Sequence, residues 1–260
     1  MIKADVIIFG GQSNMVGETE GPPESNEPVK GAYEYRYGEN DLVELKHPVG
    51  EDLFWGALEG SVKGGGSLVP SFCRTYVNKT GRTVVAIHVA CGSTTVAEWL
   101  HGTRRHYHTI RKINAAFEKI KEKYEINDIY YVWLQGESDA IIQTSEEEYF
   151  SKLIQYKNEL KSEIDFKKFC IIKIGYFASV ADWIEGTKED KIKRDEAIQR
   201  AQERVVESDK DFVMLTRVCT EYSRDKNHIN PYVGGHYNNA TLDLIGASAA
   251  ETLSTLCRET

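Results

Sequence analysis

The sequence lacks the features that would direct the protein to a membrane, to nucleic acid or to nucleotides. No stretch of the 260 residues approaches the run of about 20 apolar residues that a membrane-spanning helix needs. The net charge is −8 at pH 7, which argues against nucleic acid or an anionic membrane surface as a main partner. Neither G-x-x-x-x-G-K-[ST] nor G-x-G-x-x-G occurs, so phosphate binding by the first glycine-rich turn is disfavoured. Nothing indicates an oligomeric state.

Cysteine is scarce and shows no pattern of pairing. The five cysteines are odd in number and include no C-x-x-C spacing, so they predict reduced thiols rather than a disulfide framework. The histidines fit no common metal-site spacing, and we predict neither a metal nor a cofactor. Met1-Ile2-Lys3 leads straight into an apolar run, which leaves no room for a signal peptide. We expect a cytoplasmic protein, although a chain from which a leader had been removed would look the same.

Proline is rare outside one segment. Four of the six prolines lie in Glu18–Gly66, which ends in a glycine cluster. This composition predicts a long irregular segment, and loops of that length in a compact domain are usually functional.

Elsewhere, apolar runs alternate with amphipathic segments. The apolar runs predict strands at Asp5–Phe9, Thr83–Val89, Ile129–Leu134, Phe169–Tyr176 and Phe212–Thr216. The amphipathic segments predict helices at Leu68–Asn78, Arg105–Tyr124, Glu146–Ile164, Lys188–Ser208 and Asn239–Cys257. This alternation predicts a single domain over residues 1–260: a three-layer α/β/α sandwich around a central, mostly parallel five-stranded sheet.

The most informative short segment is a serine in a glycine-rich turn after the first strand. Gly10 and Gly11 supply the backbone freedom for a tight turn from strand into helix at Ser13. A chain that enters a helix there points free N–H groups at whatever binds. The serine of such a turn is either an exposed nucleophile or a plain helix N-cap.

Polar residues also follow the second and third predicted strands. Because the carboxyl ends of parallel strands share one edge of the sheet, Ser13, Gly92, Gln135 and Glu137 should converge there. Serine acyl transfer needs a nucleophile, a base, a group that orients the base and donors for the oxyanion. These turns supply candidates for most of those parts.

Four blocks, in order over nearly the whole chain, resemble the SGNH hydrolases. They match the sialate O-acetylesterase and acetylxylan esterase branch, the carbohydrate esterase family 6-like form. The blocks are Gly11-Gln12-Ser13-Asn14-Met15-x-Gly17, Cys91-Gly92-Ser93 with Glu98-Trp99, Trp133-Leu134-Gln135-Gly136-Glu137-Ser138-Asp139, and His236-Tyr237-Asn238-Asn239. The resemblance implies the SGNH, flavodoxin-like sandwich. It also implies a serine esterase that removes O-acetyl groups from carbohydrates through an acetyl-serine intermediate.

The resemblance assigns roles to individual positions. It makes Ser13 the nucleophile and His236 the base. The main-chain N–H groups of Ser13 and Gly92, with the side-chain amide of Gln135, would form the oxyanion hole. The residues expected to contact the substrate are Gln12, Asn14 and Trp99.

The histidine block departs from the family pattern. The family usually has an Asp three residues before the catalytic His, and position 233 is Val. Asp225 and His228 do carry the D-x-x-H spacing, so His228 stays an alternative base. We favour His236 because its distance to the closing helix fits the pattern.

The acid that would orient His236 is therefore open. Glu137 is the leading candidate, because its strand ends at the same edge of the sheet. Asp225 is the second candidate, and a Ser-His dyad helped by a backbone carbonyl is the third. Glu137 as a carboxylate that caps a nearby helix remains a further interpretation, and Asp139 is predicted to brace its loop.

The expected substrate is an acetylated carbohydrate of the xylan or sialic-acid type. Aromatic faces suit sugar rings, and Trp55, Trp99, Tyr107 and Trp183 lie in or near predicted loops. Two alternatives stay open. One is a non-catalytic carbohydrate-binding relative, which the missing Asp at position 233 favours. The other is an SGNH esterase that acts on other acyl esters.

Overall fold

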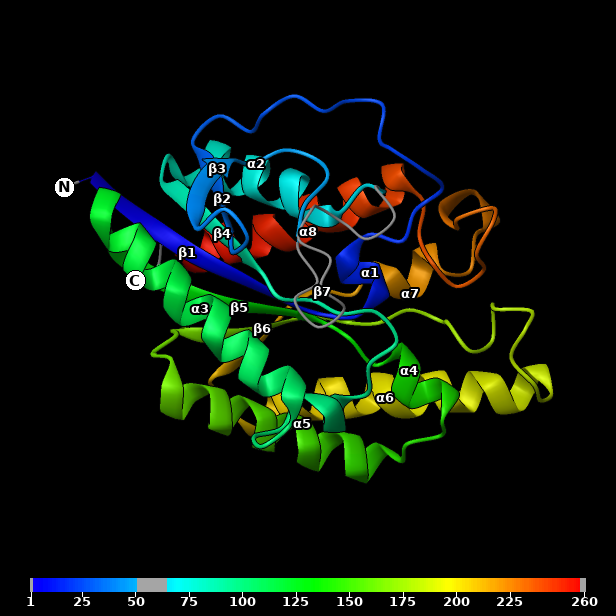
Figure 1. Ribbon diagram of the computed structural model, residues 1–260. Helices are drawn as coiled ribbons and strands as arrows, with labels where there is room; N and C mark the ends of the chain where they lie inside the picture. The colour runs from blue at the N-terminus through cyan, green and yellow to red at the C-terminus, as the bar shows by residue number, and fades with distance from the viewer. Residues whose placement is uncertain (1, 51–64, 258–260) are drawn as a thin grey trace.

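A seven-stranded sheet runs through the middle of the molecule, in the order β3-β2-β4-β1-β5-β6-β7. The computed structural model describes residues 2–50 and 65–257 (Figure 1). The strands are β1 (Ile2–Gly11), β2 (Ala32–Arg36), β3 (Asp41–Glu44), β4 (Thr83–His88), β5 (Tyr124–Leu134), β6 (Lys168–Ile172) and β7 (Phe212–Thr216). All neighbours are parallel except β2 and β3. The predicted mostly parallel sheet is confirmed.

Two strands lie where the sequence predicts an irregular segment. β2 and β3 both fall within Glu18–Gly66, so the predicted count of five strands is too low. β2 joins the sheet beside β4, and β3 pairs with β2 at the edge. The sequence pattern does not predict β2 as a strand, because Glu34 and Arg36 interrupt its apolar residues. In the structure Glu34 is fully buried and accepts hydrogen bonds from Arg36 Nε at 2.9 Å and Gly50 N at 2.7 Å.

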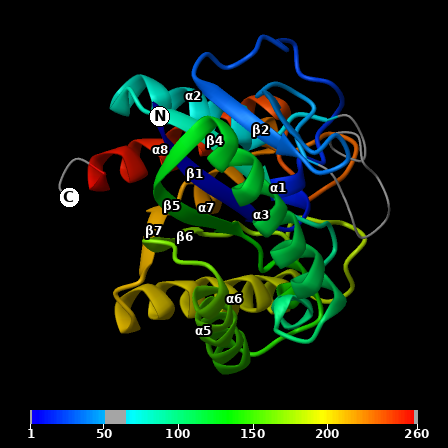
Figure 2. The same ribbon diagram turned by 60° about the vertical axis from the view of Figure 1, so that its left-hand side comes forward.

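Helices cover both faces of the sheet, which confirms the three layers. α2 (Leu68–Thr80) and α8 (Asn239–Leu256) pack together on one face. α3 (Arg104–Lys123), α5 (Glu146–Glu163) and α6 (Lys188–Ser208) lie on the other (Figures 1 and 2). The short helices are α1 (Ser13–Val16), η1 (Val96–Trp99), α4 (Glu137–Ile141), α7 (Cys219–Tyr222) and η2 (Lys226–His228).

Every long helix begins at a polar residue whose side chain accepts a hydrogen bond from the first turn. These N-caps are Ser67, Thr103, Ser145, Thr187 and Asn238. Such caps satisfy N–H groups that the helix itself leaves without acceptors. The predicted starts of these helices lie within one residue of the observed ones. Both bounds of α6 and of β7 are those that the sequence predicts.

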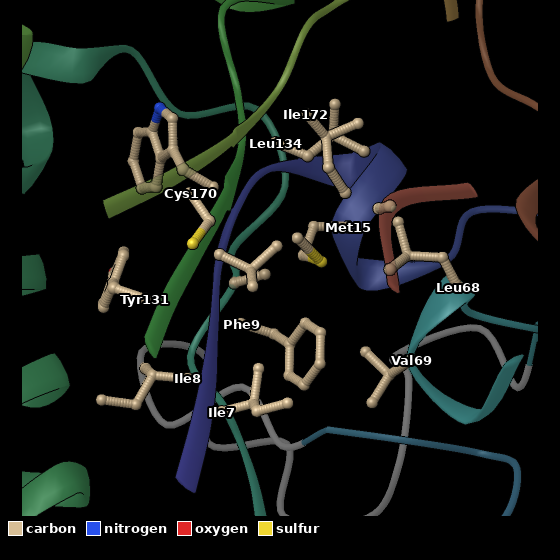
Figure 3. Close-up of a cluster of buried hydrophobic side chains, with 14 of the residues drawn as sticks. Ile7, Ile8, Phe9, Met15, Leu68, Val69, Tyr131, Leu134, Cys170 and Ile172 are labelled. Carbon is tan, nitrogen blue, oxygen red and sulfur yellow. The ribbon is translucent and has the colours of Figure 1, made fainter. Parts of the chain in front are cut away.

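The core packs around the carboxyl-terminal half of β1. Ile7, Ile8 and Phe9 have no exposed surface, and side chains from α2, β5 and β6 surround them (Figure 3). The five cysteines are all buried, and none forms a disulfide. Since β1 is apolar on both faces and central in the sheet, its carboxyl end has a fixed position.

Main-chain hydrogen bonds continue past the ends of the three central strands. Cys91 N donates to Gly11 O at 2.8 Å, and Gln12 N donates to Leu134 O at 3.0 Å. The turns after β1, β4 and β5 therefore lie side by side at the carboxyl edge of the sheet. Their predicted convergence at that edge is confirmed.

Position 11 at this edge requires glycine, because the backbone there leaves no room for a side chain. Its φ is +140°, and a Cβ there would lie 2.0 Å from Leu134 O. We expect Gly11→Ala to lower the free energy of unfolding by about 3 kcal/mol or more, because backbone must move in two strands. Gly102 also has positive φ, at +85°, but a Cβ there would meet nothing within 4 Å.

Gly102→Ala is therefore the matched control. It should cost only the conformational penalty of about 1–2 kcal/mol. Urea unfolding followed by circular dichroism measures both variants. Equal losses in the two variants would contradict a steric requirement at Gly11.

Candidate active site

Ser13 lies at the first position of α1, directly after β1. Its side chain is buried but retains some contact with solvent, at 4% exposure. Across residues 2–50 and 65–257, neither its hydroxyl nor its main-chain N–H makes a hydrogen bond. A helix N-cap would accept such a bond, and the N-cap position is Gln12 instead. The plain capping interpretation of Ser13 is therefore wrong, and its hydroxyl is available for chemistry.

Gly92 lies beside Ser13. A Cβ built on Gly92 would stand 4.0 Å from Ser13 Cβ and 3.4 Å from Glu18 Oε1. In the described part of the chain, the N–H of Gly92 also donates no hydrogen bond. Two main-chain N–H groups without acceptors thus occur on adjacent turns. Any side chain at position 92 would fill the space next to the serine.

His236 lies on the loop between η2 and α8. The residue is 6% exposed, and its ring and that of Phe177 pack at a right angle, with centroids 5.1 Å apart and an interplanar angle of 90°. Asn230 N donates to the carbonyl of His236 at 2.8 Å. The next residue, Tyr237, donates its N–H to Asn14 Oδ1 at 3.3 Å. The chain neighbours of Ser13 and His236 are therefore in direct contact, which brings the two turns together.

Glu18 is a residue of this site that the sequence interpretation missed. Its Oε2 lies 3.6 Å from Nε2 of His236, while its other carboxylate oxygen faces Gly92. Gly17 ends α1 with φ +99°, and the chain then turns so that Asn230 Nδ2 donates to Glu18 O at 3.0 Å. Glu18 opens the segment that the sequence predicts to be irregular. No spacing distinguishes it from the other acidic residues there.

Glu137 contacts Asn14 instead of the histidine ring. Its Oε1 accepts a hydrogen bond from Asn14 Nδ2 at 2.8 Å, and within the described residues Oε2 has no partner. The side chain is almost fully buried, and that burial raises the pKa of Glu137 to about 7. Asn14 therefore joins Glu137 to the main chain of Tyr237. A hydrogen-bonded path therefore runs from Glu137 through this amide to the residue next to His236.

Gln135 is occupied by its own surroundings. Its Nε2 donates to Thr94 O at 2.8 Å and to Asp139 Oδ2 at 2.6 Å, and Gln12 Oε1 lies 3.2 Å away. An amide nitrogen has only two hydrogens, and Gln135 has no exposed surface. The structure thus leaves no donor on Gln135 for a substrate oxygen. The predicted role of the Gln135 amide as an oxyanion donor therefore does not fit the structure.

The other predicted substrate contacts on the same turns are also buried. Gln12 Oε1 accepts hydrogen bonds from Gly136 N and Ser138 N, at 3.3 Å and 3.1 Å. Asn14 is committed to Glu137 and Tyr237, as described above. Both side chains are 2% exposed. Through Asn14 and Gln12 Oε1 they hold the turns in place. Within the described residues Gln12 Nε2 makes no hydrogen bond, so the contact of Gln12 with substrate stays a prediction.

Trp99 is a core residue. It has no exposed surface, packs edge-on against Trp133 with centroids 5.1 Å apart, and donates Nε1–H to Thr94 Oγ1. Its predicted contact with substrate does not fit this burial. Tyr107 and Trp183 are exposed, at 62% and 61%. Trp55 lies outside the described residues.

Asp139 braces its loop, as predicted. Its carboxylate accepts from Val96 N at 2.9 Å and from Thr144 Oγ1 at 3.1 Å. Burial raises the pKa of Asp139, against the opposing effect of these hydrogen bonds.

The alternative pair, Asp225 and His228, lies apart from these contacts. His228 Nε2 is 4.0 Å from Asp225 Oδ2, its Nδ1 is 2.9 Å from Thr241 Oγ1, and its ring stacks on Tyr222. Asp225 accepts from Asn227 N and so caps η2. Within the described chain, neither residue contacts Ser13. Both have a structural explanation.

The three layers and the serine turn at the carboxyl edge define the α/β/α sandwich fold that SGNH and GDSL-like hydrolases share. The chain belongs to a family within this class: the profile described as SASA, carbohydrate esterase, sialic acid-specific acetylesterase, matches residues 3–232. The matched region ends before His236. No curated protein is significantly similar in sequence.

Solved structures share the fold at low sequence identity. A protein from Arabidopsis thaliana has a TM-score of 0.66 and 18% identity, over 97% of this chain and 99% of that one. A carbohydrate acetylesterase from Xanthomonas citri has a TM-score of 0.59 and 12% identity, over 98% of this chain and 57% of that one. A catalytic mutant of an acetylxylan esterase from Geobacillus stearothermophilus has a TM-score of 0.50 and 15% identity, over 96% and 93%. Family and fold together indicate a carbohydrate or acyl esterase.

Across residues 2–50 and 65–257, no helix combines the length and the apolar character that crossing a membrane requires.

The buried carboxyl of Glu137 should make stability depend on pH. Its pKa of about 7 lies above the ordinary 4.5, so between these values the folded chain binds more protons than the unfolded chain. The contribution of Glu137 to stability is therefore lost as pH rises through 7. Relative to wild type, Glu137→Gln should gain about 3 kcal/mol in free energy of unfolding between pH 4.5 and pH 8.5.

Chemical denaturation at a series of pH values measures this gain. Glu203→Gln is the control, because ion pairing with Arg217 and Lys173 lowers the pKa of Glu203 to about 2. Its difference from wild type should be constant above pH 5. A difference for Glu137→Gln that does not change with pH would contradict the assignment.

Proposed function

We propose that the protein is a serine esterase that removes O-acetyl groups from carbohydrates through an acetyl-serine intermediate. The observation that carries the proposal is the hydroxyl of Ser13 beside the N–H groups of Ser13 and Gly92, none of which makes a hydrogen bond in the described chain. Main-chain donors without acceptors suit an oxyanion, because they need no rearrangement when charge develops. The loop of His236 packs against the same turn.

In the proposed reaction, His236 takes the proton of Ser13 as Oγ attacks the acetyl carbonyl carbon. The negative charge on the carbonyl oxygen is stabilised by the N–H groups of Ser13 and Gly92. His236 then returns the proton to the sugar oxygen as the ester bond breaks, which leaves acetyl-Ser13. Water attacks this ester with His236 again as base, and acetate and the serine hydroxyl are released.

Glu18 is the proposed electrostatic partner of His236. Its carboxylate lies 3.6 Å from Nε2, so it would stabilise the imidazolium that forms in each step. Glu137 contributes in another way, by fixing Asn14 and hence the main chain next to His236. This division replaces the prediction that Glu137 orients the ring directly.

A carbohydrate substrate is supported by the family and by the surface near His236. The family description and the names of two structural relatives refer to carbohydrate or xylan acetylesterases. Trp183 and Tyr232, at 61% and 79% exposure, lie on the two loops that adjoin His236. Exposed aromatic faces of this kind pack well against sugar rings.

The test uses an aryl acetate and acetylated carbohydrates, with release of acetate as the readout. We expect Ser13→Ala to lower kcat/KM by about 10⁴-fold or more, and His236→Ala to have an effect of similar size. His228→Ala should retain activity. Loss with His228→Ala but not with His236→Ala would overturn the base assignment. A wild-type protein that binds acetylated sugars without releasing acetate would instead be a non-catalytic relative.

The role of Glu18 can be tested separately. A full charge at about 4 Å interacts by about 4 kcal/mol at an effective dielectric constant of 20, before desolvation is subtracted. We therefore expect Glu18→Gln to lower kcat roughly tenfold with little change in KM, since the imidazolium forms only during reaction. Glu18→Asp should restore part of the loss.

Glu24→Gln is the control for net charge, because Glu24 is an exposed residue of the same segment. It should leave kcat unchanged. An increase in kcat for Glu18→Gln would mean that repulsion between Glu18 and the oxyanion, through the carboxylate oxygen that faces Gly92, outweighs its attraction to His236.

A further inference from the structure

A shallow cavity of about 470 Å³ opens at the same edge of the sheet, outside the serine site. Its lining comes from the end of α4, the loop after β6 and the first turns of α6. The residues that matter are Ile141, Gln143, Trp183, Glu185, Gly186 and Arg194. In α/β proteins this edge of the sheet is where ligands bind.

The cavity adjoins the His236 loop. Phe177 packs edge-on against His236, with ring centroids 5.1 Å apart, and against Trp183, with centroids 6.3 Å apart. A Cβ on Gly234 would lie 3.5 Å from Ala181 Cα, so the two loops touch directly. One intervening aromatic ring therefore separates Trp183 from the imidazole. This spacing suits a sugar chain that continues beyond the acetylated ring.

Trp183 provides an exposed but anchored aromatic face. Its side chain is 61% exposed, whereas Trp99 and Trp133 are fully buried. Lys191 Nζ donates to Ala181 O at 3.4 Å and to Ile184 O at 3.2 Å, which ties the Trp183 loop to α6. Sugar rings pack well on an exposed indole face of this kind.

Arg194 provides a positive charge that no carboxylate of the described residues pairs with. A Cβ on Gly186 would lie 3.0 Å from a guanidinium nitrogen of Arg194, so the guanidinium lies against the backbone of the Trp183 loop. The side chain is half-buried, and in the described part of the chain it makes no ion pair or hydrogen bond. Glu185 lines the same cavity without pairing with it.

Other basic side chains of α6 do have partners. Lys193 pairs with Glu189, and both Arg200 and Arg204 pair with Glu146. The contrast matters because a half-buried guanidinium gains most from a planar anion that accepts two parallel hydrogen bonds. The cavity thus combines an aromatic platform with a cation that is suited to a carboxylate.

We propose that this cavity is a subsite for a sugar ring that carries a carboxylate, next to the ring whose acetyl group is removed. The inference rests on the proposed function, in that Ser13 acts on carbohydrate esters. The ring packs on Trp183 and its carboxylate binds Arg194, while Gln143 and Glu185 face its hydroxyl groups. A uronic acid and a sialic acid both present this chemistry, and the experiment distinguishes them.

Binding is measured by calorimetry on the full chain, with sugars that carry no acetyl ester. The probes are methyl glucuronide, the methyl glycoside of N-acetylneuraminic acid, and methyl xyloside as the neutral reference. We expect at least one acidic sugar to bind at least tenfold more tightly than methyl xyloside. Arg194→Gln should abolish that preference, and Trp183→Ala should weaken every sugar that binds.

Matched controls separate local from general effects. Lys193→Gln removes the same charge one residue away, and Tyr107→Ala removes an exposed aromatic ring from α3. Both should leave binding within twofold of wild type. Equal binding of acidic and neutral sugars, no binding of any probe, or an acidic preference that survives Arg194→Gln would overturn the proposal.

The binding assay does not depend on catalysis. Acidic sugars that bind to a protein with no esterase activity would refute the proposed function and keep the subsite. Acetate release from an aryl acetate, with no preference for acidic sugars in binding, would support the proposed function and refute the subsite.

Discussion

One buried side-chain amide, that of Asn14, joins the three segments that make the site. Its Nδ2 donates to Glu137 at the start of α4, and its Oδ1 accepts from the N–H of Tyr237 on the histidine loop. Ser13 precedes Asn14 and His236 precedes Tyr237, so the two side chains that we propose to react are positioned through their chain neighbours. The amide is 2% exposed, and water therefore cannot easily replace either hydrogen bond.

Buried carboxyl groups support this arrangement at a cost in stability. Glu137 holds Asn14, and Asp195 of α6 accepts hydrogen bonds from Phe177 N, Ala178 N and Ser179 N. Burial raises the pKa of both groups, which means that the folded chain disfavours their charged forms. Asp195 thereby fixes the loop whose Phe177 packs on the imidazole. The geometry of the site depends on interactions that an apolar core would not need.

Apolar runs and amphipathic segments made most of the fold predictable. The apolar runs of β1, β4, β6 and β7 predict strands because these strands are buried on both faces. β2, which lies between β3 and β4, carries Glu34 and Arg36, so its hydrophobic pattern does not predict a strand. The turns with Ser13 and Gly92 were predictable because parallel strands end at one edge. The hydrogen-bond partners of Gln135 and Glu137 were not, since an amide or carboxylate at a strand end gives no sign in the sequence of which way it points. No residue pattern near Glu18 in the sequence indicates that its carboxylate lies close to His236.

Val233 and Glu18 together explain how this chain departs from the family pattern. Where the resemblance leads us to expect an Asp, Val233 is 37% exposed and leaves that position of the histidine loop without a charge. A carboxylate reaches His236 from the serine turn instead, because Gly17 ends α1 in the left-handed region and directs Glu18 across to the ring. The proposed nucleophile and this carboxylate then belong to one short segment, and their relative position depends on one helix end. The carboxylate that lies near Nε2 also faces Gly92, so in the proposed reaction the same charge would act on the imidazolium and on the oxyanion with opposite sign. A carboxylate on the histidine loop, away from Gly92, would attract the imidazolium without repelling the oxyanion. The carboxylate of Glu18 would do both, because it lies near both groups.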